Sequence, residues 1–300
     1  MKKTIFLLAT LGMMVACQQP EIITEADGTG TNEPAKTKKF TFTVKGVFAE
    51  PEFNIDFTYG ELTRAYLAAD GQNMTDLWVF DFVGDECVQT LHQSGSDADF
   101  GTPSLPLTYG THHVYFVASR GTAPVADATA NTITWTRPSD TFWADYPVTV
   151  VSTSNGNRAV TLDRVVTKLK VTATDEVPAD VATLELTPSL WYYGMNYVTG
   201  EPVVAVNNQP RTVTVPSSYI GTNGQLTMSI FGFSASEQWT TDVILSAKDA
   251  QGSVIGQAQV VSAPFVRNRA TEYSGPLFGA SGLATVSLNV DWVASYSGEW

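Results

Sequence analysis

Residues 39–45 read KFTFTVK, and this short stretch indicates the fold class of the chain. Phe40, Phe42 and Val44 alternate with polar residues, and a period of two is typical of a half-buried β-strand. Further along, residues 77–82 read LWVFDF, with apolar side chains at both odd and even positions. This second stretch predicts a strand that is buried on two faces and therefore lies near the centre of a sheet.

The same alternation recurs to the end of the sequence, and turn signals separate the apolar runs. Further strands are predicted at residues 114–118, 132–136, 165–171, 213–215, 226–230, 243–247, 254–261 and 284–293. No window of a dozen residues shows a convincing 3.6-residue period, which argues against a parallel α/β sheet. Many short strands at a spacing of ~10 residues predict an all-β chain of the sandwich or barrel class.

The composition indicates a chain that can bury a real core. Of 300 residues, 43% are hydrophobic and only 16% are charged. This length suggests two domains of ordinary size, and the polar turn near residues 156–159 is the expected boundary between residues 38–158 and 159–300. With 17 basic against 30 acidic side chains, the charge disfavours binding to nucleic acid.

The first residues have the features of an export signal. Lys2 and Lys3 precede an apolar run at residues 5–15, which is too short to span a bilayer permanently. The run ends in Ala16-Cys17, which resembles the bacterial lipobox and implies cleavage before Cys17 and a lipid on its sulfur. An ordinary signal peptide that happens to contain a cysteine is the alternative. We expect residues 1–16 to be a signal peptide and residues 17–37 a flexible tether, with several acyl chains anchoring the protein to a membrane.

The search for catalytic chemistry finds no enzyme motif. The sequence lacks a G-x-S-x-G elbow, an H-E-x-x-H motif and a P-loop. His112 and His113 are neighbours on a predicted strand and must point to opposite faces, which predicts one surface imidazole beside a packed one rather than a metal site. We expect no catalytic residue, no metal and no cofactor, and we interpret Cys87 as structural and the acidic residues 97–99 as a solvated turn.

One aromatic cluster, Trp191, Tyr192 and Tyr193, offers a possible ligand surface. These three rings could stack on a sugar and would then make the protein a surface glycan-binding lipoprotein. Aromatic clusters in β-rich chains are more often core or cross-strand packing, which is the alternative interpretation.

Several segments together resemble the fimbrillin family, the lipoprotein-precursor pilins of Bacteroides-type bacteria. The resemblance rests on the lipobox and tether, on LTRA at 62–65 before LWVFDF at 77–82, on LPL at 105–107 with YG at 109–110 before VYFVA at 114–118, on LDRVVTKL at 162–169 and on PFVRNRAT at 264–271. It covers most of the mature chain, and its motifs consist of alternation and turn residues.

The resemblance implies a fold and an assembly route. It implies two tandem transthyretin-like antiparallel β-sandwich domains. In the family, an arginine-specific protease cuts after the first strand, and a C-terminal segment of the next subunit fills the groove that is left. Here the cut would fall at Arg64-Ala65, and the strand at residues 39–47 would be removed. The alternative for Arg64 is a plain loop arginine.

The donor in this scheme would be the strand at residues 284–293. It would insert its alternating apolar side chains, which are Val286, Leu288, Val290 and Trp292, into the groove by β-augmentation. The alternative is a final strand that stays in its own second domain. A donated strand makes a head-to-tail contact that does not close, and such contacts propagate a filament.

The expected function is therefore a structural subunit of a cell-surface fimbria that supports adhesion. Its expected partners are other fimbrial subunits, an arginine-specific protease and the outer membrane, through the lipid on Cys17. A base-anchor or tip accessory subunit is the alternative within the family, because such subunits share the sandwich plan.

Overall fold

The computed structural model describes residues 35–46, 74–120, 123–279, 285–286 and 296–299, and nearly all of its regular structure is β-strand. The strands of the N-terminal half are β1 (Thr37–Gly46), β2 (Asp76–Val83), β3 (Glu86–Ser94), β4 (Ser104–Thr108), β5 (Gly110–Ser119), β6 (Val125–Asp127), β7 (Thr132–Thr134), β8 (Thr141–Val150) and β9 (Asn157–Arg164). The C-terminal half contains β10 (Val166–Ala173), β11 (Val181–Pro188), β12 (Trp191–Asn196), β13 (Pro202–Val206), β14 (Arg211–Thr214), the 3-10 turn η1 (Ser217–Tyr219), β15 (Thr227–Phe233), β16 (Trp239–Asp249), β17 (Val254–Phe265), β18 (Ala270–Gly275), β19 (Thr285–Val286) and β20 (Tyr296–Glu299). The predicted all-β class is confirmed.

Seven of the strands described in the N-terminal half form one sheet, which folds around its own core. The strand order is β3-β2-β5-β8-β9-β1-β4. Between β8 and β9 only two residue pairs are in register, Phe142 with Arg164 and Trp143 with Asp163, so the sheet turns a corner there. Side chains from β1, β4 and β9 on one arm and from β2, β5 and β8 on the other meet in a single apolar cluster.

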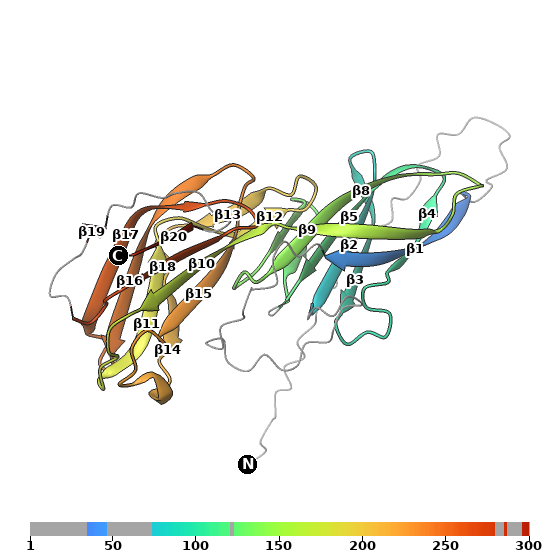
Figure 1. Cartoon of the computed structure of the whole chain (residues 1–300). Helices are drawn as coiled ribbons and strands as arrows, with labels where there is room; N and C mark the ends of the chain where they lie inside the picture. The colour runs from blue at the N-terminus through green and yellow to red at the C-terminus, as the bar shows by residue number, and fades with distance from the viewer. Residues whose placement is uncertain (1–34, 47–73, 121–122, 280–284, 287–295, 300) are drawn as a thin grey trace, which may run out of the picture.

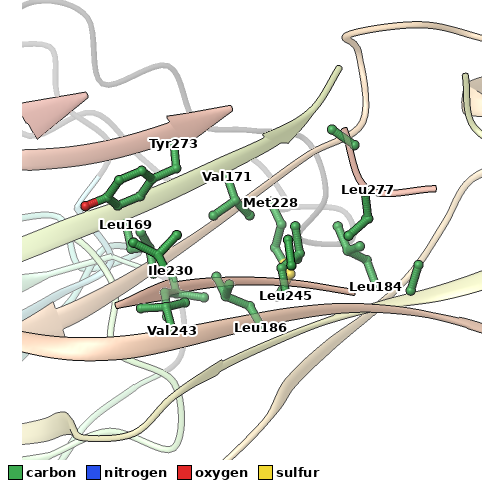
Figure 2. Packing of buried hydrophobic residues seen from close by; sticks show 14 of the residues in the cluster. Leu169, Val171, Leu184, Leu186, Met228, Ile230, Val243, Leu245, Tyr273 and Leu277 are labelled. Atoms are coloured by element: carbon green, nitrogen blue, oxygen red, sulfur yellow. The ribbon is translucent and has the colours of Figure 1, made fainter. Parts of the chain in front are cut away.

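In the C-terminal half, two sheets face each other across a second apolar cluster. One sheet has the order β15-β10-β18-β20 and the other β14-β11-β16-β17-β19. Figure 2 shows part of the cluster between them, where Leu169, Val171 and Ile230 of the first sheet lie near Leu186 and Val243 of the second. These strands are rich in the β-branched and apolar residues that favour a pleated, half-buried surface.

A short sheet and a third apolar cluster join the two halves. β7 of the N-terminal half pairs with β12 of the C-terminal half, giving the order β13-β12-β7-β6, and Figure 1 shows β12 and β13 where the two halves meet. Phe80 of β2 lies in this cluster with Tyr197, and their rings stack with centroids 3.8 Å apart. The opposite face of β2 carries Leu77 and Val79 into the N-terminal core. The prediction of a central strand apolar on both faces is confirmed.

The structure differs from the sequence predictions in two respects. Most of β9 lies beyond the predicted boundary at residue 159. It nevertheless pairs with β1 and β8 and completes the N-terminal sheet, so the two halves divide after Arg164. The turn at residues 155–156 therefore lies within one half. Four strand pairs are also parallel, whereas an antiparallel sandwich was expected: β1–β9, β10–β18, β17–β19 and β18–β20. Parallel neighbours need a crossover connection, which local alternation does not reveal. The transthyretin-like arrangement remains a prediction.

Truncating the stacked ring of Phe80 tests the coupling between the halves. We expect Phe80→Ala to lower the free energy of unfolding by about 3–5 kcal/mol, because it leaves a cavity in the shared cluster. Urea unfolding followed by circular dichroism measures the loss. The control is Val88→Ala on β3, where the side chain is exposed and a change within about 0.5 kcal/mol is expected. Equal stability of the two variants would contradict the structure.

Candidate strand-exchange site

β1 lies inside its sheet, between β9 and β4, although it is the first described strand of the chain. It runs antiparallel to β4, with Phe40 opposite Leu105, and parallel to β9, with Val44 opposite Val160. β4 is the outermost strand on this side in the described part of the sheet. Figure 1 shows β1, in blue, running alongside β9. Removing β1 would therefore open a slot within the sheet rather than trim its edge.

The alternation that predicts β1 also decides which of its side chains are buried. Phe40 and Phe42 are 0% exposed and Val44 is 8% exposed. The ring of Phe42 packs edge-on against Phe116 of β5, with centroids 5.2 Å apart, and against Tyr146 of β8, with centroids 5.7 Å apart. β1 thus supplies the part of the N-terminal core that faces the other arm of the sheet.

The backbone of β1 is bonded on both sides. Thr41 N–H donates to the carbonyl of Gly156 at 2.8 Å, while Phe42 N–H donates to the carbonyl of Pro103 at 2.9 Å on the opposite side. Gly156 approaches so closely that a Cβ there would lie 2.4 Å from the carbonyl oxygen of Lys39. A glycine is therefore needed where the chain enters β9 beside β1.

A buried polar cluster fixes β4, the outer wall of the slot. His112 is 1% and Asp81 2% exposed, and Nδ1 of His112 lies 2.7 Å from the carboxylate of Asp81. Nε2 of the same ring lies 3.0 Å from the carbonyl oxygen of Thr108, to which it must donate. The cluster links β2, β5 and the last residue of β4. It holds β4 by a contact that does not involve β1.

Burial and hydrogen bonding shift the pKa of Asp81 in opposite directions. Burial raises the pKa of Asp81 above its ordinary value, and the hydrogen bond and charge of His112 offset only part of that increase. The exposed neighbour His113 instead bonds to Asp145 at the surface, with Nδ1 and Oδ1 2.9 Å apart. The predicted pair of one packed and one surface imidazole is confirmed.

The predicted donor residues lie almost entirely outside the described part of the chain. Val286 is described in its backbone, where β19 pairs in parallel with Val260 of β17 over two residues. Leu288, Val290 and Trp292 lie outside the described residues. β20 pairs in parallel with β18 over four residues, from Thr271 to Ser274. β19 and β20 are the outermost strands of the two C-terminal sheets.

Three other predicted positions also fall outside the described residues. These are Cys17, the expected lipidation site, and Arg64 and Ala65, the expected cleavage site. Their roles stay predictions. The described part of the chain contains no helix that is long and apolar enough to cross a membrane, and its His, Cys, Asp and Glu residues form no group of three that could hold a metal ion.

The structure places the aromatic cluster at residues 191–193 mainly in the core. Trp191 is 2% exposed, and its indole N–H donates to the carbonyl of Phe231 at 2.9 Å. A Cβ at Gly232 would lie 2.4 Å from the indole ring, so the ring fills the space beside that glycine. Tyr193 is 5% exposed, and Tyr192 is half-buried. These rings pack as the alternative interpretation describes and do not form an exposed stacking surface.

Sequence reasoning missed the walls of the slot and the cluster that holds one of them. The sequence features that could have revealed this cluster are Asp81, within one apolar strand, and His112, near the start of another. Each indicates a buried polar group that needs a partner, but neither identifies which residue that partner is.

The chain is thus an all-β protein whose first described strand is enclosed between two strands distant in sequence. The model of a family of unknown function, DUF6562, matches residues 111–300, and the chain belongs to this family. No curated protein matches its sequence.

Solved structures with a similar arrangement include proteins from the genera Bacteroides and Porphyromonas. An adhesin-like protein from Bacteroides ovatus is 11% identical, with a TM-score of 0.46 over 90% of this chain and 98% of the other. The fimbrial anchor protein Mfa2 from Porphyromonas gingivalis is 9% identical, with a TM-score of 0.43 over 74% and 82% of the two chains. The tip fimbrial protein Mfa3 from the same organism is 13% identical, with a TM-score of 0.38 over 79% and 94%. Similarities of this size assign no function to the chain.

The two neighbouring histidines provide a matched test of the cluster beside β4. We expect Asp81→Ala to lower the free energy of unfolding by about 3 kcal/mol or more, because it leaves a buried imidazole without its partner. Asp145→Ala removes the partner of the exposed His113 and should cost less than about 1 kcal/mol. Urea denaturation measures both. Losses of similar size would show that the buried pair does not hold this part of the sheet.

Proposed function

We propose that this protein is a structural subunit of a cell-surface fimbria, exported as a lipoprotein precursor and assembled by exchange of β1 for a C-terminal segment of the next subunit. The observation that carries the proposal is the placement of β1. A single strand at the start of the described chain fills an interior slot with three buried apolar side chains.

The topology of the N-terminal sheet supports removal of β1 as a unit. β1 pairs with β4 and β9, and with neither does it form a hairpin. From β1 to the rest of the sheet, the chain runs only through the connection between Gly46 and Asp76. A cut at Arg64-Ala65, within that connection, would leave β1 held by non-covalent contacts alone.

The energetics of those contacts favour exchange over simple loss. Burying an apolar side chain such as Phe40 or Phe42 contributes roughly 1.5–3 kcal/mol each. Leaving the slot empty would also expose unpaired backbone groups on β4 and β9, a state that invites pairing with another strand. A cut chain should therefore keep β1 until a competing strand takes its place.

The chemistry of the slot favours one kind of occupant. It accepts an extended segment with apolar side chains at every second residue, as Phe40, Phe42 and Val44 show. The sequence at 286–292, VSLNVDW, has the same period. Such a segment from a second subunit would pair with β4 and β9 by β-augmentation and extend a head-to-tail polymer.

The remaining parts of the proposal concern location. The signal peptide at residues 1–16 and the lipid on Cys17 would carry the precursor to the outer membrane, and an arginine-specific protease would release the mature subunit to the surface. The proposed role is non-enzymatic and does not involve nucleic acid. A base-anchor or tip subunit would use the same sandwich plan, and an anchor would keep its lipid and β1.

Limited proteolysis of residues 18–300 tests the exchange. With a trypsin-like protease, we expect one rapid cut after Arg64 and then a ladder of oligomers whose extent rises with protein concentration, because each donated strand comes from another molecule. Denaturing gels without boiling and N-terminal sequencing of the product, which should begin at Ala65, provide the measurement.

Two variants serve as controls for this experiment. Arg64→Gln should resist the cut and remain monomeric, and a chain ending at residue 283 should be cut but form no ladder. Uniform digestion of the wild-type protein, or a cut product that stays monomeric at every concentration, would refute strand exchange. Surface material that contains only chains with a lipidated Cys17 would favour the anchor alternative.

A further inference from the structure

The turn that follows β18 is held by a single carboxylate from the loop after β10. Asp175 accepts hydrogen bonds from three successive backbone N–H groups. Leu277 N lies 2.9 Å from Oδ1, and Phe278 N and Gly279 N lie 2.6 and 2.8 Å from Oδ2. Bonds from N–H groups to an ionised carboxylate are stronger than those between neutral groups, and consecutive N–H groups form a concave site for an anion.

The loop that carries Asp175 is itself fixed on both sides. Before it, Thr174 N–H donates to the carbonyl of Gly275 at 2.9 Å, which extends the pairing of β10 with β18. After it, Val177 N–H donates to the carbonyl of Thr222 at 3.0 Å, and Glu176 forms an isolated bridge with Asn223. Asp175 therefore projects from a rigid part of the C-terminal half.

The turn is also anchored by the side chain of Leu277, which is buried in the C-terminal apolar cluster. Leu277 is 1% exposed, and Figure 2 shows it close to Leu184, at the end of the cluster opposite Tyr273. A Cβ at Gly256 of β17 would lie 2.5 Å from the carbonyl oxygen of Leu277. The turn thus crosses β17 at the one residue type that allows so close an approach.

The protonation state of Asp175 agrees with this geometry. Partial burial by itself would raise the pKa of the carboxyl, but the hydrogen bonds from Leu277, Gly279 and Phe278 outweigh it, and the pKa lies below its ordinary value. At neutral pH the group is a carboxylate and can accept all three bonds.

We propose that Asp175 is the positioning residue that fixes residues 277–279, the turn by which the chain leaves the C-terminal core, and that this fixed turn is required for the donor segment to reach a second subunit. The role in partner exchange rests on the proposed function. The anchoring of residues 277–279 does not, and it can be measured separately.

Hydrogen exchange on the full mature chain, residues 18–300, tests the anchor. In Asp175→Asn we expect the amides of Leu277, Phe278 and Gly279 to exchange roughly tenfold faster or more, because one charged acceptor is lost. Amides of β2 and β5 provide an internal reference for global unfolding. The matched control is Asp180→Asn, an exposed acidic residue five positions away, which should leave all these rates unchanged.

A second readout separates the anchor from the polymer. After protease treatment, Asp175→Asn should give fewer oligomers in the discrete ladder than the wild-type protein and Asp180→Asn. Wild-type rates at residues 277–279 in Asp175→Asn would overturn the anchor, and so would faster exchange spread equally over β2 and β5. An unchanged ladder despite lost protection would overturn the role in exchange. A wild-type protein that never forms a ladder would refute the proposed function, while the exchange rates would still decide the anchor.

Discussion

The burial of Phe40 and Phe42 in the slot between β9 and β4 is the interaction on which the N-terminal half depends. The residues that pair with β1 lie 63–71 positions further along the chain in β4 and 116 positions further along in β9. β1 joins these two strands into one sheet, because it pairs with the backbone of both and covers the core between them. One short segment therefore completes the sheet by pairing with two strands that are distant from it in the sequence.

Buried polar groups then determine how these elements fit together. Asp81 and His112 tie β2 and β5 to the end of β4. At the junction of the halves, Arg164 is 2% exposed, its Nε lies 2.6 Å from Asp140, and its Nη1 lies 3.0 Å from Oδ1 of Asn268 in the C-terminal half. Buried charges are costly unless every partner is in place. We infer that these contacts favour one arrangement of strands over alternatives with the same apolar pattern.

The two ends of the described chain have complementary properties. β1 is deeply buried yet is joined to the rest of its sheet by a single connection, and the turn at residues 277–279 is held by the carboxylate of Asp175. In the proposed function, β1 would be the strand that is replaced, and residues 277–279 would position the segment that replaces it in the next subunit of a head-to-tail polymer.

The amino-acid sequence by itself determined the all-β class, the positions of most strands and the buried face of β1, because a period of two depends only on which residues are neighbours. It also indicated the two-sided burial of β2 and the opposite environments of His112 and His113. Only the tertiary structure decided that β9 belongs to the first sheet, that β1 runs parallel to it and that Trp191 lies in the core. Those features depend on pairing between segments that are distant in the sequence. The alternation of apolar and polar residues along a strand does not reveal them, because it is the same whichever strand pairs with it.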